Sequence, residues 1–352
     1  MGVGGRLFRL TVMGLALLGS ASGWARGADV AVRDLASELQ GAQGKLAAGD
    51  YAQAYEAYLA HSEDNPLAQF SVGLFFQYGW GRPVDLAQAC RWQEKAAQGN
   101  IPAAQAALAE CLRHGVHRSV DLIGAAHWYE QAALSGMLTA NCSLAELFMA
   151  GEGVPKNPNK AIQLCRAVAE KGVPSAQLQL ARFHLEGDAT VRDPVAALQW
   201  MQSAAQSKLP EAQYRLGLML RNGVGKPANM AAARWWLESA GEQGWAPAYL
   251  PTAELYFSAP VDAESGVLSP PDLAKAYLWS AAATQVLNNE PEANSARALL
   301  AKVLALMPST WKPELDRQIA EHLARLNAEK PSGAPELRFV FEISSFSRFP
   351  IW

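Results

Sequence analysis

The sequence repeats itself every 36 residues. Five alanines and five glycines recur at this interval: Ala89, Ala125, Ala161, Ala197 and Ala233, and Gly79, Gly115, Gly151, Gly187 and Gly223. A fixed period of about 20 to 50 residues is typical of proteins in which one small unit of secondary structure is stacked many times. Each unit buries its apolar side against the next, so the 352 residues form a line of small cores. The period predicts a solenoid folded as one elongated domain.

The first half of each unit has the pattern of an amphipathic helix. An alanine near its start recurs in every unit: Ala68, Ala104, Ala140, Ala176, Ala212 and Ala248. An aliphatic and a small residue follow four and five positions later, as in Leu108-Ala109 and Leu216-Gly217, which places all three on one helix face. The recurring glycine, often in a Gly-x-Gly motif, ends this helix because glycine readily adopts the left-handed conformation.

The second half of each unit predicts a second helix after a short loop. An aspartate or asparagine stands where its side chain would cap the first turn: Asp85, Asp121, Asn157, Asp193, Asn229 and Asp272. The helix then carries the pattern Ala-x-x-Trp, as in Ala197 with Trp200, although Leu164 replaces the tryptophan in the third unit. Small residues let two helices approach closely, and the indole fills the gap between units.

These motifs together resemble Sel1-like repeats, which are related to the tetratricopeptide repeats. The clearest unit begins with Pro210-Glu211-Ala212-Gln213-Tyr214-Arg215-Leu216-Gly217 and continues through Gly223-Val224-Gly225 to Ala233-Arg234-Trp235-Trp236. The resemblance covers residues 66–284, as five regular units and a sixth with an inserted loop. It implies an all-α fold, a right-handed α-solenoid of helix-turn-helix repeats. His117 and Ala189 replace the second glycine of the loop motif and leave the local loop geometry open.

The segments that flank the repeats follow other patterns. Residues 1–25 are typical of a signal peptide, with Arg6 and Arg9 before a short apolar run and small residues before cleavage after Ala25. Export would place the mature protein in the periplasm or outside the cell, and the alternative is that the segment is kept as an anchor. Residues 29–65 resemble a degenerate first unit, and residues 285–330 predict the capping helices that such arrays need.

The C-terminal tail, residues 331–352, predicts a short strand. Four apolar residues alternate at a period of two: Leu337, Phe339, Phe341 and Ile343. A single strand cannot pair with itself. We expect it to dock on the solenoid, and the alternative is that it joins the edge of a partner's sheet.

The charge and hydropathy of the chain argue against two kinds of partner. A formal net charge of −3 offers no basic surface to nucleic acid or to an anionic membrane. No segment after the signal peptide is apolar enough to insert into a membrane. A protein or peptide is the partner that remains, and the oligomeric state stays open.

Four cysteines in an exported chain predict two disulfides. Cys90 and Cys111 lie symmetrically about one predicted turn, and Cys142 and Cys165 about one predicted loop, so each pair faces across two antiparallel helices. The alternative is that all four are small buried apolar residues.

Two further groups of residues could carry chemistry, and we expect neither to do so. The spacing of Cys111, His114 and His117 is compatible with zinc but provides no fourth ligand, so we expect no metal and no cofactor. Ser309-x-x-Lys312 is the nucleophile pattern of penicillin-interacting and β-lactamase-like enzymes. Because no Lys-Thr-Gly or Ser-Asp-Asn motif accompanies it, an enzyme is the alternative to the expected non-catalytic protein.

The resemblance to tetratricopeptide proteins implies that the first helices line a concave groove. From the inward positions we select eight residues for partner binding: Phe70, Leu178, Arg182, Tyr214, Leu218, Arg221, Leu250 and Phe257. Aromatic residues and arginine are enriched at interaction hot spots, although a solvated face with incidental aromatics would look similar. We expect an exported scaffold that holds a protein or peptide, and the family implies a role in cell-envelope assembly or host interaction.

Overall fold

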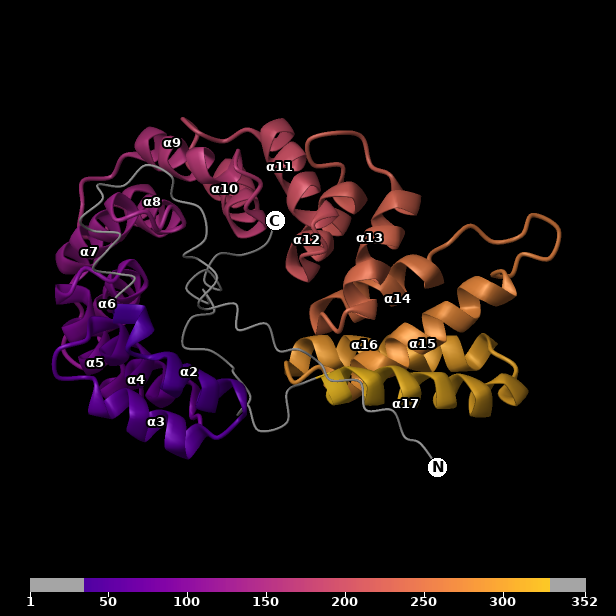
Figure 1. Cartoon of the computed structure of the whole chain (residues 1–352). Helices are drawn as coiled ribbons and strands as arrows, with labels where there is room; N and C mark the ends of the chain where they lie inside the picture. The colour runs from indigo at the N-terminus through magenta and orange to yellow at the C-terminus, as the bar shows by residue number, and fades with distance from the viewer. Residues whose placement is uncertain (1–34, 330–352) are drawn as a thin grey trace, which may run out of the picture. The chain divides into compact units, whose positions relative to one another are not determined.

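The computed structural model describes residues 35–329, which form helices and, within these bounds, no strand (Figure 1). The predicted signal peptide and the strand predicted in the tail lie outside the described residues. The chain divides into two compact units, whose described parts are residues 35–140 and 141–329. Between residues 35 and 329, no helix is both long and apolar enough to cross a bilayer.

In the first unit, helices pack against one another in chain order. They are α2 (Gln40–Ala47), α3 (Tyr51–Ala60), α4 (Pro66–Tyr78), α5 (Leu86–Gln98), α6 (Pro102–His114) and α7 (Leu122–Leu134). Leu39 and Tyr58 share a buried cluster with Val72 and Phe75 of α4. The segment before the first regular repeat therefore closes the apolar end of that repeat.

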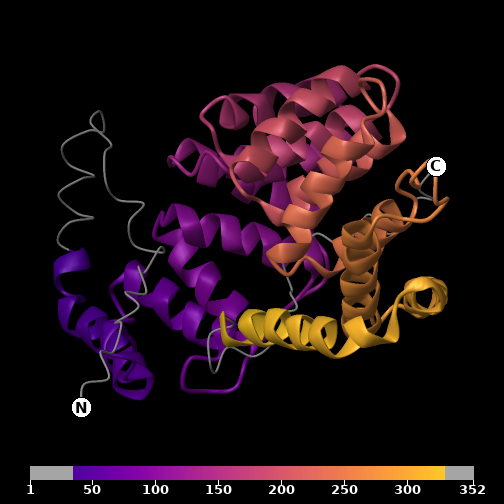
Figure 2. The same cartoon turned by 90° about the vertical axis from the view of Figure 1, so that its right-hand side faces the viewer.

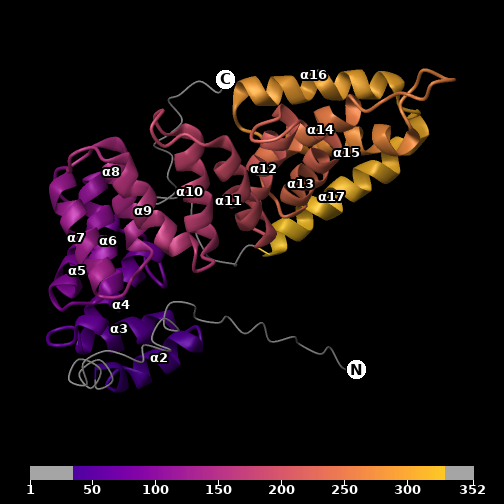
Figure 3. The same ribbon diagram turned by 90° about the horizontal axis from the view of Figure 1, so that it is seen from above.

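In the second unit, successive helices from α9 to α16 also pack against one another. Its helices are α8 (Ala140–Ala150), α9 (Pro158–Ala169), α10 (Pro174–Glu186), α11 (Pro194–Gln206), α12 (Pro210–Asn222), α13 (Met230–Glu242), η2 (Ala246–Ala248), α14 (Tyr249–Phe257), α15 (Pro270–Val286), α16 (Glu290–Leu306), η3 (Ser309–Trp311) and α17 (Lys312–Glu329). Figure 2 shows α16 and α17 running in different directions, and Figure 3 places them on either side of α15, against which both pack.

Tryptophan links neighbouring repeats in the second unit, as the sequence predicts. Trp200 packs against the buried cluster of α8 to α10 and also against the next cluster, which includes Leu216 and Leu237. Its indole therefore belongs to two successive cores at once. An aromatic side chain at this position gives each repeat a large apolar contact with its neighbour.

Five of the six predicted helix caps are correct. The side chains of Asp85, Asp121, Asn157, Asp193 and Asn229 each accept a hydrogen bond from a backbone N–H in the first turn of the following helix. The prediction for Asp272 is wrong. Ser269 caps α15 by accepting from the backbone N–H of Asp272, and its hydroxyl donates to the Asp272 carboxylate. The loop before α15 therefore ends three residues earlier than the predicted cap.

The recurring glycine closes a first helix in the left-handed conformation at four positions: Gly79, Gly115, Gly151 and Gly223. The prediction is wrong for Gly187, whose φ is −65°. Here Asp188 forms a local turn by accepting hydrogen bonds from the backbone N–H and hydroxyl of Thr190, while Arg192 donates to the Gly187 carbonyl. This loop lacks the second glycine, and side chains hold it in another shape.

Candidate functional site

Both predicted disulfides are present. Cys90–Cys111 joins α5 to α6, and Cys142–Cys165 joins α8 to α9, with Cα–Cα distances of 5.8 and 4.4 Å. All four cysteines are thus oxidised, as expected for a protein that folds in an oxidising compartment.

Seven of the eight predicted partner-binding residues lie in the second unit, and we call these seven the predicted strip. They come from α10 (Leu178 and Arg182), α12 (Tyr214, Leu218 and Arg221) and α14 (Leu250 and Phe257). The eighth, Phe70, is a half-buried residue of α4 in the first unit.

The helices contribute unequally to the accessible part of the strip. Leu178 and Arg182 are only 8% and 6% exposed, so α10 offers little side-chain surface. Tyr214 and Leu218 are half-buried at the edge of one core cluster, and Leu250 and Phe257 at the edge of the next. The accessible apolar surface of the strip therefore lies on α12 and α14.

The more exposed of the two arginines in the strip has a partner on the neighbouring repeat. Arg221 lies 3.1 Å from the carboxylate of Glu254 on α14, and both side chains are partly exposed. Tyr214 lies near these charges, and its pKa is raised by burial and by the negative charge of Glu292. The strip thus has an apolar centre with a paired acidic and basic rim.

A separate cleft of about 1170 Å³ lies in the second unit. Its lining comes from the turn between α11 and α12, from α13 and α15, and from α17. Three of the lining residues are tryptophans: Trp235, Trp236 and Trp279. Polar residues line the cleft beside them: Lys208, Gln213, Glu242 and Gln243. We call it the tryptophan cleft. Trp235 is 59% exposed, which is unusual for so large an apolar side chain.

The Glu238 carboxylate on α13 contacts two residues that line the cleft, Lys275 and Trp279. Glu238 accepts hydrogen bonds from the Tyr256 hydroxyl at 2.6 Å and from the Trp279 indole N–H at 3.4 Å, and it pairs with the Lys275 ammonium. Burial and the adjacent Glu238 carboxylate raise the pKa of Tyr256. These contacts fix the orientation of Lys275 and Trp279, both of which line the cleft.

His322 of α17 forms the opposite wall of the cleft. One ring nitrogen lies 3.1 Å from the Tyr249 hydroxyl, and the other 3.2 Å from the Arg325 guanidinium. Because a guanidinium can only donate, Nδ1 of His322 accepts, and the ring is neutral. Burial lowers the pKa of His322, and the positive charge of Arg325 lowers it further.

We predict that acid weakens the packing of α17 through His322. A histidine whose pKa is lowered by folding binds a proton more readily in the unfolded chain, so its contribution to stability is present above its unfolded pKa of about 6.5 and is lost as pH falls through the folded value. Hydrogen-exchange protection of α17 should therefore fall between about pH 7 and pH 5. His322→Gln should show a smaller fall, and an equal fall in both proteins would contradict the assignment.

The lysine of the Ser309-x-x-Lys312 pattern is engaged by a carboxylate. Ser309 lies in η3, and Lys312, at the first turn of α17, pairs with Asp316 in an exposed position. The hydrogen bond to Asp316 raises the pKa of Lys312. A lysine that serves as a general base needs a lowered pKa, so this arrangement does not favour the enzyme alternative.

The predicted cysteine and histidine cluster is only partly assembled. His114 turns to Glu110, with 3.4 Å between its Nε2 and the carboxylate. The structure instead brings Cys90 together with Cys111 and His117.

The tryptophan cleft does not follow from the repeat pattern, although one residue of the sequence points to it. Trp235 stands one position before the tryptophan of the Ala-x-x-Trp motif, where the preceding four units carry Arg91, His127, Gln163 and Gln199. A tryptophan in a polar column is a candidate contact residue. The wall formed by α17 has no counterpart in the repeat pattern.

The comparisons with known proteins agree with this architecture. The model of the Sel1 repeat matches five consecutive segments: 66–101, 102–137, 139–173, 174–208 and 210–245. A Sel1 repeat protein from Oxalobacter formigenes has a similar structure, with 27% identity and a TM-score of 0.58, covering 71% of this chain and all of that one. A second similar structure, c5321, is described as a protective antigen present in uropathogenic Escherichia coli strains and displaying an SLR fold.

The c5321 structure is 23% identical with a TM-score of 0.60, and the match covers 81% of this chain and 60% of that one. No curated protein matches the chain significantly. The five family matches, which follow the helix pairs from α4 to α13, carry the assignment. The chain belongs to the Sel1 repeat family.

Proposed function

We propose that the protein is an exported, non-catalytic scaffold that binds another protein or a peptide on the predicted strip. The observation that carries the proposal is the accessible apolar surface of Tyr214, Leu218, Leu250 and Phe257, bordered by the Arg221–Glu254 ion pair. An apolar centre with a polar rim is the usual anatomy of a protein interface. Two disulfides support export, because such bonds persist in oxidising compartments.

The tryptophan cleft is a second candidate surface on the same unit. Its support is the 59% exposure of Trp235, next to the half-buried Trp236. Tryptophan is one of the residue types enriched in interaction hot spots. Cell-envelope assembly or host interaction is the setting we propose for either surface.

The two surfaces can be distinguished by photo-crosslinking in the cells that produce the protein. A benzoylphenylalanine is introduced in place of Tyr214, of Trp235 or, as a matched control, of Met230, which is 52% exposed at the start of α13. We expect a defined adduct from position 214 and none from position 230. An adduct from position 235 alone would move the binding site to the cleft, and the absence of adducts from both would contradict the scaffold proposal.

We predict that Tyr214→Ala combined with Arg221→Ala weakens binding of the identified partner at least tenfold, about 1.4 kcal/mol. The double variant removes a half-buried aromatic ring and one half of the rim ion pair. Circular dichroism checks that helix content is retained, and titration calorimetry gives the affinity. If binding persists in this variant but is lost when residues 331–352 are deleted, the tail recruits the partner.

A further inference from the structure

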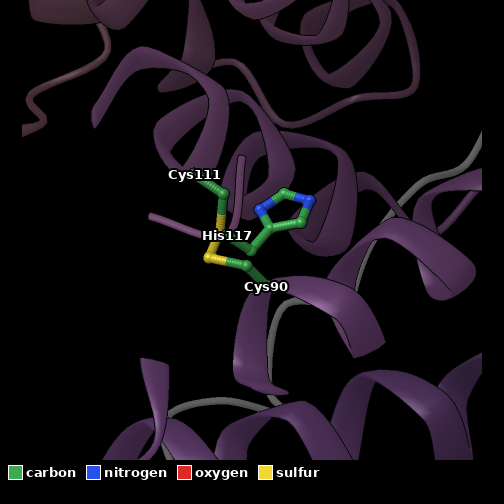
Figure 4. Close-up of side chains that lie close together, drawn as sticks. All are labelled: Cys90, Cys111 and His117. Atoms are coloured by element: carbon green, nitrogen blue, oxygen red, sulfur yellow. A yellow bond between two sulfur atoms is a disulfide. The ribbon is translucent and has the colours of Figure 1, made fainter. Parts of the chain in front are cut away.

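One disulfide of the protein lies directly against a histidine. The sulfurs of Cys90 and Cys111 and a nitrogen of His117 all lie within 4.8 Å of one another. Figure 4 shows the imidazole ring of His117 beside the S–S bond, with one nitrogen turned toward the sulfurs. Cys90 comes from α5, Cys111 from α6, and His117 from the loop that follows α6. Among residues 35–329, the other disulfide has no comparable cluster around it.

The histidine is held in this position by a carboxylate. Nε2 of His117 lies 3.2 Å from a carboxylate oxygen of Glu94, which stands one helical turn after Cys90 on α5. The His117 side chain is only 6% exposed, and its Nδ1 is buried without a hydrogen-bond partner. A carboxylate that accepts from Nε2–H leaves the lone pair of Nδ1 free to bind a ligand. Metal-binding histidines are commonly oriented in this way.

There is a small space for a further ligand beside the sulfurs. A cavity of about 10 Å³ is lined by Cys90, Cys111, Gln77 and Gln93, and this is about the volume that one water needs. Gln93 is 1% exposed, and neither its amide nitrogen nor its amide oxygen has a hydrogen-bond partner. Burying an unpaired amide is costly, so an additional polar species here would relieve that cost.

We propose that reduction of the Cys90–Cys111 disulfide opens a binding site for a borderline-soft divalent cation such as Zn²⁺. A dithiol reductant supplies two electrons and two protons, so the S–S bond becomes two thiols and the dithiol becomes a disulfide. The cation then displaces both thiol protons and is held by the two thiolates and Nδ1 of His117. A water or the Gln93 amide oxygen takes the fourth position. A small-molecule disulfide reverses the reaction: it accepts two electrons and two protons to become two thiols, the Cys90–Cys111 bond forms again, and the cation is released.

The distances between the three ligand atoms are compatible with this ligand set. Zinc lies about 2.3 Å from thiolate sulfur and about 2.0 Å from imidazole nitrogen, which separates neighbouring ligand atoms of a tetrahedron by about 3.5 Å. The sulfur and nitrogen atoms already lie within 4.8 Å of one another. Reduction needs only to let the sulfurs move apart, and because the cysteines lie on two different helices, rotation of the side chains can achieve this.

Co²⁺ is the probe that tests the proposal, because thiolate ligands give it a charge-transfer absorption. The full chain is reduced with dithiothreitol. The dithiothreitol is then removed under anaerobic conditions, and the reduced protein is titrated with Co²⁺. We expect one ion per chain with the thiolate band in the reduced protein and none in the oxidised protein. Cys142→Ser with Cys165→Ser should leave the band unchanged, whereas Cys90→Ser with Cys111→Ser should abolish it.

The histidine and its carboxylate give the decisive variants. We expect His117→Gln to weaken Co²⁺ binding at least tenfold, and Glu94→Gln to weaken it about tenfold, as is usual for a residue that orients a ligand. Circular dichroism of the oxidised variants checks that they fold. Binding that is unchanged by His117→Gln, or that depends on the Cys142 and Cys165 pair, would overturn the proposal.

Discussion

We expect removal of the Cys142–Cys165 disulfide to lower the local free energy of unfolding of α8 and α9 by about 3 kcal/mol. The two cysteines are separated by 23 residues in the sequence. For a loop of this length, the chain-entropy model gives a stabilisation of about 3 kcal/mol, which is lost when the bond is removed. Cys165 is also fully buried in the cluster formed by α8, α9 and α10. Native-state hydrogen exchange of Cys142→Ala with Cys165→Ala measures the effect helix by helix.

The other disulfide provides the matched comparison. Cys90–Cys111 has a sequence separation of 21, so its removal should cost about the same, but in α5 and α6. It joins two successive matched repeats, 66–101 and 102–137, whereas Cys142 and Cys165 lie within one repeat, 139–173. Because stability in a repeat array is local, α12 and α13 should keep their protection in both variants. A uniform loss in all helices would contradict this view.

Helix boundaries in this chain follow from interactions within a few residues, and the sequence predicts them well. Pro102, Pro174 and Pro210 are the first residues of α6, α10 and α12, as their fixed φ angle and missing N–H require. Aspartate and asparagine caps act over three residues or fewer. Because the period repeats these local interactions, one unit predicts its neighbours.

The period fails where a loop changes length or loses a motif residue. The longer loop before α15 brings Ser269 to the cap position and moves Asp272 into the first turn. Gly187 belongs to a loop whose second glycine is Ala189, and Asp188 determines its turn. In both loops, a side chain that the repeat pattern does not specify decides the backbone conformation.

The candidate surfaces were harder to predict because they depend on residues distant in sequence. Arg221 was expected to offer its guanidinium to a partner, but Glu254, 33 positions later, already pairs with it. The wall of the tryptophan cleft that contains His322 comes from α17, which lies beyond the matched repeats. Periodicity indicates which helix face is available, but it does not indicate what the terminal helices cover.

The second glycine of the Gly-x-Gly motif should be the most sensitive backbone position of its loop. Gly225 has a φ of +78°, and a Cβ atom there would lie 2.3 Å from the carbonyl oxygen of Pro194, at the start of α11 in the preceding repeat. Gly225→Ala must therefore adopt a left-handed conformation and also push two repeats apart. We expect a loss of about 3 kcal/mol in the unfolding free energy, from about 1 kcal/mol of backbone strain and about 2 kcal/mol of overpacking.

Gly172 separates these two costs, because its φ is +79° but a Cβ atom there would meet nothing within 4 Å. Gly172→Ala should therefore lose only about 1 kcal/mol, which is the cost of the left-handed conformation alone. Hydrogen exchange in the helices next to each loop gives both values. A larger loss for Gly225→Ala means that the motif lets successive repeats touch. Equal losses would mean that the motif serves only to turn the chain, and that the contact with Pro194 contributes nothing.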